Sequence, residues 1–347
     1  MIKRLQNINN IQPSLQDVAN RVGCSTATVS RVLNKPESVK AALRNKVMNA
    51  MEELGYLPNS AARALRSRRT HIMGIVIPTL NYAIYARLVE GLQQKLAMNG
   101  YSLLVATSDY NLFEEVNQAR VLIERGVEGL VLVGNVHEAS LYELLETSKT
   151  PYTNTYVYQD GNVHPCIGFD NKHATSKITE YLLNLGHTKF GVISAILIGN
   201  DRASERVAGV RTTLDTFGLS LEDEFVYQCP YSIAGGREGF RYLLSLKNKP
   251  TAIICGNDVL AMGALIEARS LSIQIPSAAS IVGFDNLEFS AHLEPPLTTI
   301  DVPAKEMGES AAEYLVQKVT GRTAIQSLHL EPRLIVRKTS GPAPDNS

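Results

Sequence analysis

The sequence predicts two kinds of structure in one chain: a small all-α head that contains a helix-turn-helix, and a larger α/β core of two lobes built on parallel sheets. Three observations predict this division. Positive charge is concentrated in residues 1–69, helical patterns without a strand fill residues 14–55, and short apolar runs alternate with amphipathic stretches from residue 71 onward. With 347 residues, the chain is long enough to bury two or three separate cores.

The head contains three helical patterns. The first helix starts with a capping-box-like pair, Ser14 and Asp17, and an apolar stripe follows along the same helix. A Gly-Cys pair interrupts this stripe, and Ser25 is placed to cap a second helix over residues 26–33. A third amphipathic stretch ends at Gly55. A helix, a short glycine-containing turn and a second helix make a helix-turn-helix pattern.

The charge of the head indicates a polyanionic partner. Residues 1–69 hold twelve Lys/Arg against four Asp/Glu, so they carry +8, whereas the remaining residues carry −8. A basic module on an acidic body favours nucleic acid as the partner. The alternative from charge alone is a basic face that is merely solvated. The helix-turn-helix pattern lies within the basic segment, so the two signals support each other.

From residue 71 the pattern becomes α/β. Buried strands are expected at 71–79, 101–108, 129–134, 189–195, 251–256 and 280–285. Amphipathic helices are expected at 84–99, 112–125, 171–185, 201–217 and 259–270. Strands without polar alternation that are separated by helices predict parallel sheets covered on both faces, and the length predicts two lobes. A ligand cleft is then expected beyond the carboxyl ends of the strands.

Other classes of protein are disfavoured. No apolar run is long enough for a transmembrane helix, and residues 1–13 lack the apolar segment of a signal peptide, so a cytoplasmic protein is expected. The four cysteines are scattered, which predicts neither a disulfide nor a zinc site, and no cofactor is expected. The motifs of hydrolases, zinc proteases, P-loop enzymes and dinucleotide-binding enzymes are missing, so an enzyme is not expected.

Several fragments resemble the lactose/galactose repressor (LacI/GalR) family. LQDVANRVGCSTATVSRVLN (15–34) resembles its helix-turn-helix, and ELGYLPNSAARAL (53–65) resembles the end of its third helix and its hinge. ERVAGV, CGNDVLAMGAL, SIVGFDN and PPLTTI extend the resemblance over about residues 14–340. It implies a homodimeric repressor of an operator in double-stranded DNA, with a hinge helix and a sensor core like a periplasmic binding protein.

Five segments are expected: a tail (1–13), the helix-turn-helix domain (14–57), a hinge helix and linker (58–70), the sensor core (71–340) and a tail (341–347) whose Pro- and Gly-rich composition predicts disorder. One lobe of the core is expected to comprise residues 71–168 with 301–330. The other is expected to comprise residues 169–300 with 331–340. The chain lacks a long C-terminal heptad run, so a dimer is expected rather than a tetramer.

Residues of the head carry over one by one. Thr26 and Ala27 begin the second helix and match the family's specificity pair in the major groove. Arg31 lies one turn further on, where it can bond guanine O6 and N7; a phosphate contact is the alternative. Phosphate-contacting or capping roles are expected for Ser14, Ser25, Ser30 and Asn34. Lys40 replaces the Ser that often caps the family's third helix, so either it contacts phosphate or the helix starts without a cap.

The hinge supplies a second set. Residues 59–66 are Ala-rich and follow a proline, so they predict a helix too short to be stable alone. The residues expected to contact DNA there are Asn59, Ala62, Arg63 and Leu65. Leu65 matches the family leucine that wedges into the minor groove, with Ala62 beside it. The alternative makes Leu65 a linker residue that packs on the core.

In the core, the resemblance marks residues expected to hold a small polar ligand: Tyr82, Tyr85, Asp170, Arg202, Arg206, Tyr231, Asn257 and Asp285. Arg206 and Asp285 match the two main ligand-binding charges of the family. The alternative role, a structural ion pair, is open for these charges and more so for Arg202 and Asp170. Asp258 is expected to cap the helix that starts beside it.

The ligand class stays open between three candidates. Arg202 and Arg206 lie one turn apart near a helix N-terminus, which favours an anion, and NKPESVKAALR and GFDN resemble the gluconate-repressor branch. A sugar acid is therefore the first expectation, a neutral sugar the second and a purine the third. Two alternative functions remain: a solute-binding protein without a DNA role, and a purine-sensing, corepressed regulator of the same family.

Overall fold

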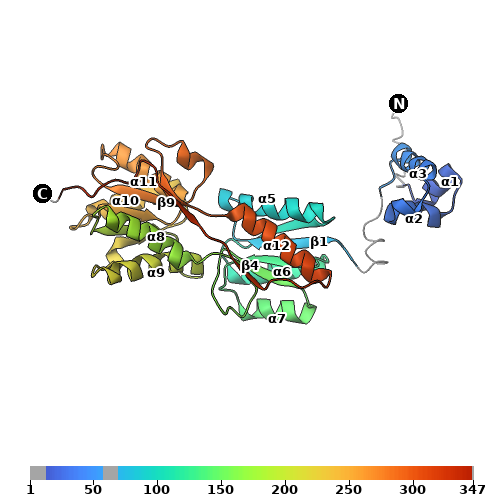
Figure 1. Cartoon of the computed structure of the whole chain (residues 1–347), viewed down its shortest axis with the longest axis horizontal. Helices are drawn as coiled ribbons and strands as arrows, with labels where there is room; N and C mark the ends of the chain where they lie inside the picture. The colour runs from blue at the N-terminus through green and yellow to red at the C-terminus, as the bar shows by residue number, and fades with distance from the viewer. Residues whose placement is uncertain (1–12, 58–68, 346–347) are drawn as a thin grey trace, which may run out of the picture. The chain divides into compact units, whose positions relative to one another are not determined.

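The computed structural model describes residues 13–57 and 69–345 (Figure 1). Contacts divide the chain into a head, Met1–Thr70, and a core, His71–Ser347. The two units are described separately below.

The head is a compact group of short helices, as the sequence predicts. They are α1 (Leu15–Val22), α2 (Thr26–Asn34), the 3-10 turn η1 (Pro36–Ser38) and α3 (Ala41–Leu54). The capping box forms, because the Ser14 hydroxyl accepts from the Asp17 N–H while the Asp17 carboxylate accepts from the Ser14 N–H at 2.8 Å. Buried Val18, Val29 and Val47 bring the three α-helices together.

Local backbone conformation ends two of these helices. Gly23 has φ 74° and Gly55 has φ 64°, the left-handed conformation that terminates a helix most easily at glycine. At the start of α3, the Lys40 side chain makes no capping hydrogen bond. The third helix therefore begins without a side-chain cap, and a phosphate contact by Lys40 stays a prediction.

Lobe 1 of the core is a six-stranded sheet with the order β11-β5-β4-β3-β1-β2. Its strands are β1 (Ile72–Ile77), β2 (Ser102–Thr107), β3 (Leu130–Val133), β4 (Tyr152–Thr155), β5 (Cys166–Gly168) and β11 (Ser327–His329). Its helices are α5 (Ala83–Met98), α6 (Leu112–Glu124), α7 (Ala139–Ser148) and α12 (Ala304–Val319). Apolar residues of α5 and α12 cover one face of the sheet, and those of α6 and α7 cover the other.

Lobe 2 repeats this arrangement with the order β12-β10-β9-β8-β6-β7. Its strands are β6 (Phe190–Ser194), β7 (Val226–Gln228), β8 (Ala252–Cys255), β9 (Ser280–Asp285), β10 (Thr298–Asp301) and β12 (Arg333–Ile335). Its α-helices are α8 (Asn171–Asn184), α9 (Asp201–Thr216), α10 (Ile233–Ser245) and α11 (Asp258–Ser270), and it also contains the 3-10 turns η2 (Asp223–Phe225) and η3 (Glu288–Ala291). The two lobes are therefore α/β layers of the expected class.

The chain passes between the lobes three times: between β5 and α8, between β10 and α12, and between β11 and β12. Pairing is parallel between described strands, as expected, except that β12 runs antiparallel to β10 with Thr299 opposite Ile335. The chain reaches β12 directly from β11 of the other lobe, without the helical crossover that joins neighbouring parallel strands, so β12 can pair antiparallel at the edge of the sheet.

The six strands and five core helices expected from the sequence are present, with ends that shift by at most two residues. The elements not anticipated are β4, β5, β7, β10, β11, β12, α7, α10 and α12. The unexpected strands have only three or four residues, and β4 reads YTNT, so these strands lack the apolar run that identified the others. Their positions are set by neighbouring strands.

The expectation of a disordered tail from residue 341 is wrong for its first residues. The Gly341 N–H donates to Ser280 Oγ at 3.0 Å, and the Ala343 N–H donates to the Leu185 carbonyl at 2.8 Å. The Pro/Gly-rich composition predicts disorder, but these two backbone N–H groups bond acceptors on lobe 2 and hold the start of the tail in place.

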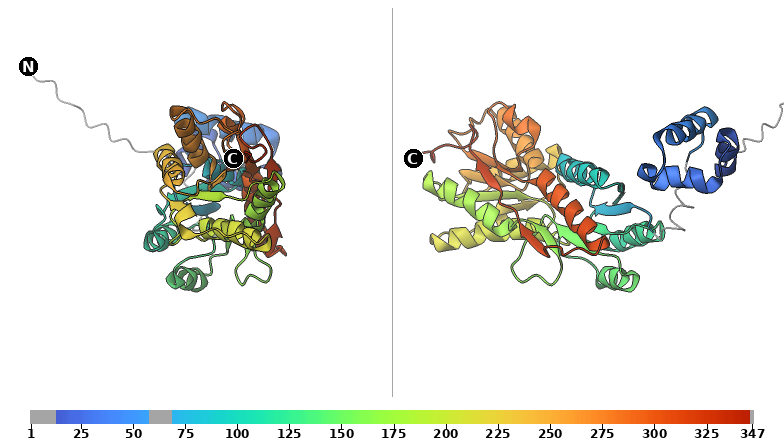
Figure 2. Two further views of the ribbon diagram at one scale, coloured as in Figure 1. Left: turned by 90° about the vertical axis from the view of Figure 1, so that its left-hand side faces the viewer. Right: turned by 45° about the vertical axis from the view of Figure 1, so that its right-hand side comes forward.

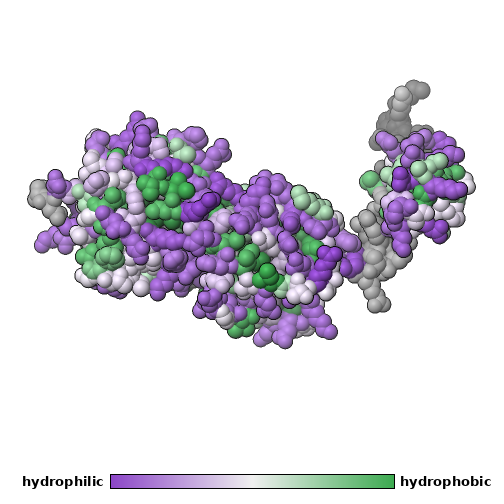
Figure 3. Space-filling view, viewed as in Figure 1, coloured by the Kyte–Doolittle hydropathy of each residue, from purple (hydrophilic) through white to green (hydrophobic). Residues whose placement is uncertain are grey.

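Figure 3 shows small apolar patches separated by hydrophilic surface on the face in view. Within residues 13–57 and 69–345, no helix is both long and apolar enough to cross a membrane.

Helices α5 and α12 approach each other closely through glycines, and they lie side by side in Figure 1 and in the right view of Figure 2. A Cβ atom at Gly91 would overlap the Lys305 carbonyl oxygen, and one at Gly308 would overlap the Leu88 carbonyl oxygen. Both obstacles are backbone atoms, which cannot move aside by a change of rotamer.

We therefore expect Gly91→Ala to lower the free energy of unfolding. Alanine gains about 1 kcal/mol of helix propensity over glycine, but overpacking against backbone costs about 1–3 kcal/mol and exceeds this gain when the helices cannot separate. Urea denaturation of the full chain measures the difference. Gln93→Ala, on the exposed face of α5, is the control and should change stability by less than about 0.5 kcal/mol. A Gly91→Ala variant as stable as this control would contradict the close helix contact.

Candidate functional site

The exposed face of α2 is the first candidate site. Buried Val29 and Val32 fix the rotation of the helix, so that Ala27, Arg31 and Asn34 are exposed along one face. These residues follow the i, i+4, i+7 spacing of a single helical face. The helix-turn-helix thus presents the Arg31 side chain and the small Ala27 side chain to solvent, and Thr26 is partly exposed beside them.

Polar residues around α2 have structural partners. The Ser25 hydroxyl accepts from the Thr28 N–H at 3.2 Å and caps the helix. The Asn34 side-chain amide donates to the Ser30 carbonyl at 2.7 Å. Ser14 caps α1 in the same way as Ser25 caps α2. These bonds fix the helix ends. The Ser14 hydroxyl also donates its hydrogen to Asp17 Oδ2 at 2.7 Å, and the Ser25 hydroxyl lies 3.0 Å from the Thr28 hydroxyl, so both hydroxyls are engaged within the head.

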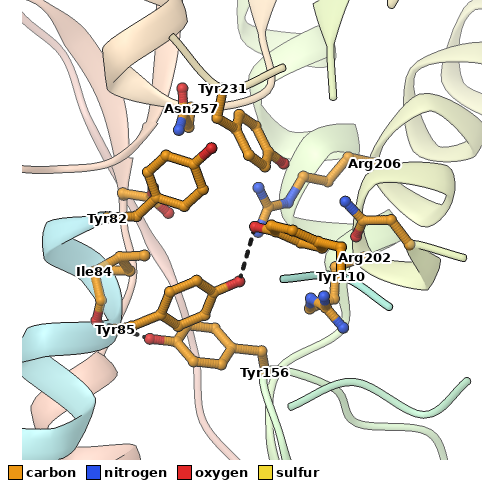
Figure 4. Close-up of a pocket in the computed structure, with 11 residues that line it drawn as sticks. Tyr82, Ile84, Tyr85, Tyr110, Tyr156, Arg202, Arg206, Tyr231 and Asn257 are labelled. Carbon is orange, nitrogen blue, oxygen red and sulfur yellow. Dashed lines mark hydrogen bonds between the residues drawn. The ribbon is translucent and has the colours of Figure 1, made fainter. Parts of the chain in front are cut away.

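The second candidate site is a cavity between the two lobes of the core (Figure 4). Lobe 1 contributes Tyr82, Ile84, Tyr85, Tyr110 and Tyr156, and lobe 2 contributes Asn200, Arg202, Arg206, Tyr231, Asn257 and Asp285. The cavity lies where the carboxyl ends of both sheets meet, as expected for open parallel sheets. Its free volume is only about 30 Å³, whereas small-molecule pockets usually have several hundred. The structure is therefore a closed state.

Arg206 is the most firmly held cation in the cavity. Its Nε donates to Asn171 Oδ1 at 2.9 Å and its Nη1 donates to the Gly256 carbonyl at 2.8 Å. The guanidinium also stacks over the Phe284 ring at 3.8 Å from the centroid. Two hydrogen bonds and one aromatic face fix the plane of the group, which leaves its remaining N–H donors available in a defined direction.

Asp285 lies at the end of β9 in an unusual backbone conformation. Its φ is 111°, which is strained for a residue with a side chain. Burial raises the pKa of its carboxyl to about 8; the Arg206 charge opposes this shift and the Asp258 charge adds to it. At neutral pH this carboxyl is therefore largely protonated in the closed state and can both donate and accept hydrogen bonds.

Asp258 fixes the segment that follows Asp285. Its carboxylate accepts from the Leu287 N–H at 2.7 Å and from the hydroxyls of Ser290 and Thr299, each at 2.5 Å. Burial raises its pKa to about 6 despite these bonds. The expectation that Asp258 caps its own helix is wrong, because Asn257 accepts from the Leu260 N–H and is the cap of α11. Asp258 instead anchors the segment that follows β9.

Arg202 is paired within the protein. Its Nη1 donates to Asp201 Oδ1 at 2.7 Å and to the Val133 carbonyl of lobe 1 at 3.1 Å. Its side chain is 9% exposed. The sequence suggested two arginines facing one anion; the structure shows that Asp201 neutralises Arg202. Asp201 was missed because a carboxylate at the first position of a helix is already explained by the helix dipole.

The tyrosines form the apolar walls of the cavity. Tyr82 of lobe 1 meets Tyr231 of lobe 2 edge to face at 5.4 Å between centroids, and Tyr85 meets Tyr156 in the same way at 5.6 Å. The hydroxyls of Tyr85 and Tyr110 are 3.3 Å apart (Figure 4). Burial raises the pKa of Tyr231 to about 12, so its hydroxyl remains protonated.

The structure brings most of the expected ligand residues together. Tyr82, Tyr85, Arg202, Arg206, Tyr231, Asn257 and Asp285 line this cavity. Asp170 does not; it caps α8 by accepting from the His173 N–H at 2.9 Å and faces a separate hollow. Ile84, Tyr110, Tyr156 and Asn200 were not anticipated. The sequence does contain a signal for Tyr110, because this residue follows the carboxyl end of the strand predicted at 101–108, and the carboxyl ends of parallel strands face the cleft.

Some expectations fall elsewhere. Asn59, Ala62, Arg63 and Leu65 of the expected hinge lie outside the described residues. Over the described part of the chain, no group of three His, Cys, Asp or Glu side chains is placed to hold a metal ion.

A helix-turn-helix head joined to a two-lobed core with a closed polar cavity defines a DNA-binding regulator with a ligand-binding domain. Family comparison agrees with this class. Residues 14–59 match the family "Bacterial regulatory proteins, lacI family", and residues 70–338 match "Periplasmic binding proteins and sugar binding domain of LacI family". The chain belongs to the LacI family, as its sequence motifs predicted, and is a DNA-binding transcriptional regulator rather than an enzyme.

Individual relatives cover nearly the whole chain. The HTH-type transcriptional regulator DegA of Bacillus subtilis is 31% identical over 96% of this chain and 99% of its own length. A crystal structure of the lac repressor dimer bound to operator and the anti-inducer ONPF is 26% identical, with a TM-score of 0.85 over 95% of this chain and 99% of that one. The structure of a CelR–cellobiose complex is 27% identical, with a TM-score of 0.70 over 94% and 99% of the two chains.

The raised pKa of Asp285 predicts a pH dependence of stability. Its ordinary value is 3.8 and its folded value is about 8, so between these values the folded chain binds more protons at this site than the unfolded chain. Its contribution to stability is complete below the unfolded pKa and is lost as the pH rises through the folded pKa. Asp285→Asn removes this contribution, so its melting temperature should fall less than that of the wild type between about pH 5 and about pH 8.

Thermal melts of both chains in matched buffers measure this difference. Asp170→Asn is the control, because an asparagine can also cap α8 and the position does not line the cavity. Parallel pH profiles for the wild type and Asp285→Asn would show that Asp285 is ionised in the folded chain.

Proposed function

We propose that this protein is a dimeric repressor that acts on chromosomal DNA in the cytoplasm and senses a neutral sugar in the interlobe cavity. Two heads would bind the half-sites of a pseudopalindromic operator, with α2 in the major groove of each. The hinge residues Asn59, Ala62, Arg63 and Leu65 would fold on DNA, and Leu65 would enter the minor groove. Ligand and operator would then compete or cooperate through the conformation of the core.

The observation that carries the choice of ligand is the charge balance of the cavity. Asp201 neutralises Arg202, so of the two arginines that favoured an anion only Arg206 is left without a carboxylate partner, and it is already bonded to Asn171 and the Gly256 carbonyl. A sugar acid would place its carboxylate in the cavity that the buried Asp285 carboxyl also lines, with only this one partly engaged cation to pair with, and an incompletely paired buried carboxylate costs several kcal/mol. A sugar acid is therefore the second candidate.

The walls support a neutral polyhydroxylated ligand. Tyrosine rings offer apolar faces to the C–H groups of a sugar ring, while their hydroxyls, Arg206, Asn257 and Asp285 offer donors and acceptors to its hydroxyls. The match of the core to a family described as sugar-binding and the likeness to a CelR–cellobiose complex support the same class. Aromatic rings also stack on nucleobases, so purines belong in the test.

The ligand would act by differential affinity for two core conformations. With about 30 Å³ free, the closed state has no room for a monosaccharide, so binding requires the lobes or the tyrosine rings to move. A ligand that prefers one conformation shifts the population, and a tenfold change in operator affinity requires about 1.4 kcal/mol of coupling. Operator binding must then change ligand affinity by the same factor.

The ligand proposal is tested by thermal shift. We expect neutral mono- or disaccharides to raise the melting temperature of the full chain, because a ligand that binds only the folded state at 100 times its Kd stabilises it by about 2.7 kcal/mol. Aldonic acids, uronic acids and nucleobases form the comparison panels. Asp285→Ala should abolish the shift given by the active sugar, while Asp170→Ala should retain it. A response confined to sugar acids or to purines would overturn the neutral-sugar assignment.

The head is tested by replacing the exposed arginine of α2. Arg31→Ala should weaken cognate operator binding by about 1–3 kcal/mol and relax the preference for guanine at one position of each half-site. Fluorescence anisotropy with the cognate operator, a half-site variant and unrelated DNA at constant salt separates the two roles. Equal weakening on all three duplexes would identify Arg31 as a phosphate contact.

A further inference from the structure

The first two residues of α9 hold a turn of the opposite lobe. The turn, residues 133–135, follows β3 in lobe 1. Arg202 of lobe 2 donates to the Val133 carbonyl at 3.1 Å, and Asp201 accepts from the Asn135 N–H at 2.5 Å. Asp201 also holds Arg202 through its other carboxylate oxygen at 2.7 Å. One ion pair on lobe 2 thus satisfies two backbone groups of lobe 1.

The turn has a glycine where this contact requires one. Gly134 has φ 97°, and a Cβ atom there would overlap Arg202 Nη1 and lie 2.8 Å from Asp201 Oδ1. Any side chain at this position would push the guanidinium out of its place. The sequence of the turn is therefore adapted to a contact made by a residue 68 positions later in the chain.

On lobe 1, buried side chains hold the turn firmly. His137 Nε2 lies 3.0 Å from the Gly134 carbonyl, and His137 Nδ1 lies 2.7 Å from Glu115 Oε2. The Asn154 amide donates to Asn135 Oδ1 at 3.0 Å. The His137 side chain is fully buried. Because the turn is fixed to lobe 1, a movement of lobe 2 at this contact displaces the whole sheet of lobe 1 and does not merely bend the turn.

The pair also divides the cleft in two. Arg202 lines the closed cavity of about 30 Å³, whereas Asp201 lines a neighbouring hollow of about 630 Å³ that also includes Asn135 and Asn162. Both side chains are mostly buried, at 9% and 13% exposed. Interactions between such groups are screened less by water than those on the surface.

We propose that Asp201, Arg202 and Gly134 form an interlobe latch that keeps the core closed in the absence of ligand. Releasing the latch frees Arg202 and joins the small cavity to the neighbouring hollow, which makes room for the effector. The latch is a regulatory part of the ligand site assigned above and rests on that proposed function. The apparent affinity for effector falls with the fraction of chains that are open, so a weaker latch gives tighter effector binding.

The chain contains no tryptophan, so a single introduced tryptophan reports on the cleft. Tyr82 lies across the cleft from Tyr231, and Tyr82→Trp would place the indole against that ring in the closed state. Opening exposes the indole to water, which moves its emission to longer wavelength and increases quenching by acrylamide. Every variant is compared in this background, in the full chain and without ligand.

Asp201→Ala removes both latch bonds of the carboxylate, and Gly134→Ala displaces Arg202. Both should shift the emission to longer wavelength and increase quenching. Asp201→Asn retains an acceptor for the Asn135 N–H and should shift less than Asp201→Ala. Gly218→Ala is the matched control: Gly218 follows the other end of α9 with φ 72°, and a Cβ there would meet nothing within 4 Å. It introduces backbone strain without a collision.

Circular dichroism establishes whether each variant is folded. If Gly134→Ala does not fold, the comparison of Asp201→Ala with the reporter chain alone tests the latch. Emission and quenching equal to those of the reporter chain in both latch variants would overturn the latch, and so would an equal shift in Gly218→Ala. No effector is added, so this result is independent of the sugar screen. Failure of the screen would leave the latch standing, and failure of the latch would leave the ligand class standing.

Discussion

The buried carboxylate of Asp258 is the interaction on which the ligand-facing half of the core depends. It ties the start of α11 to the segment after β9 and to β10 through one N–H and two hydroxyls. Gly283 leaves room for it, because a Cβ there would overlap its Oδ1. Asp285 and Asn286 both have positive φ, which is strained for residues with side chains. The hydrogen bonds of Asp258 to the neighbouring segment help to offset this strain.

Asn286 extends the same anchor to the other lobe. Its carbonyl accepts from Arg87 of α5 at 2.9 Å, and its side chain bonds Asp301 and Arg337. Polar contacts between the lobes therefore lie at separate places: Arg87 on Asn286, Asp201 with Arg202 on the 133–135 turn, and the Asn171 amide on the Tyr156 carbonyl. Contacts of this kind break as discrete units, because packed interfaces switch between arrangements and do not deform continuously.

Both arginines of the cleft are held by partners within the protein. Arg202 pairs with Asp201, and Arg206 is held by Asn171, the Gly256 carbonyl and the Phe284 ring. A buried site that is rich in donors and acceptors discriminates by hydrogen-bond geometry, because an analogue that leaves one group unpaired loses more than the bond itself. The basic head differs from the core because its surplus of positive charge suits the phosphates of DNA whatever the base sequence.

The sequence by itself determined the division into head and core, the three head helices, the six most apolar strands and the family. These features depend on local signals: the Ser14–Asp17 capping box, the glycines that end helices and apolar runs of suitable length. It also named Arg206, Asp285 and Tyr231, because their motifs resemble those of a known family. What it left out, such as the polar strand β4 and the cavity residue Tyr156, has no local signal and depends on neighbours distant in the chain.

Only the tertiary structure decided how the charges are used. The sequence places Arg202 and Arg206 one turn apart and suggests an anion, but the folded chain turns Asp201 onto Arg202 and brings Val133 to the same guanidinium. It assigns the cap of α11 to Asn257 and gives Asp258 to a segment about 30 residues away. Spacing along a helix fixes which side chains share a face, whereas the partner of a buried charge is chosen by what the fold packs against that face.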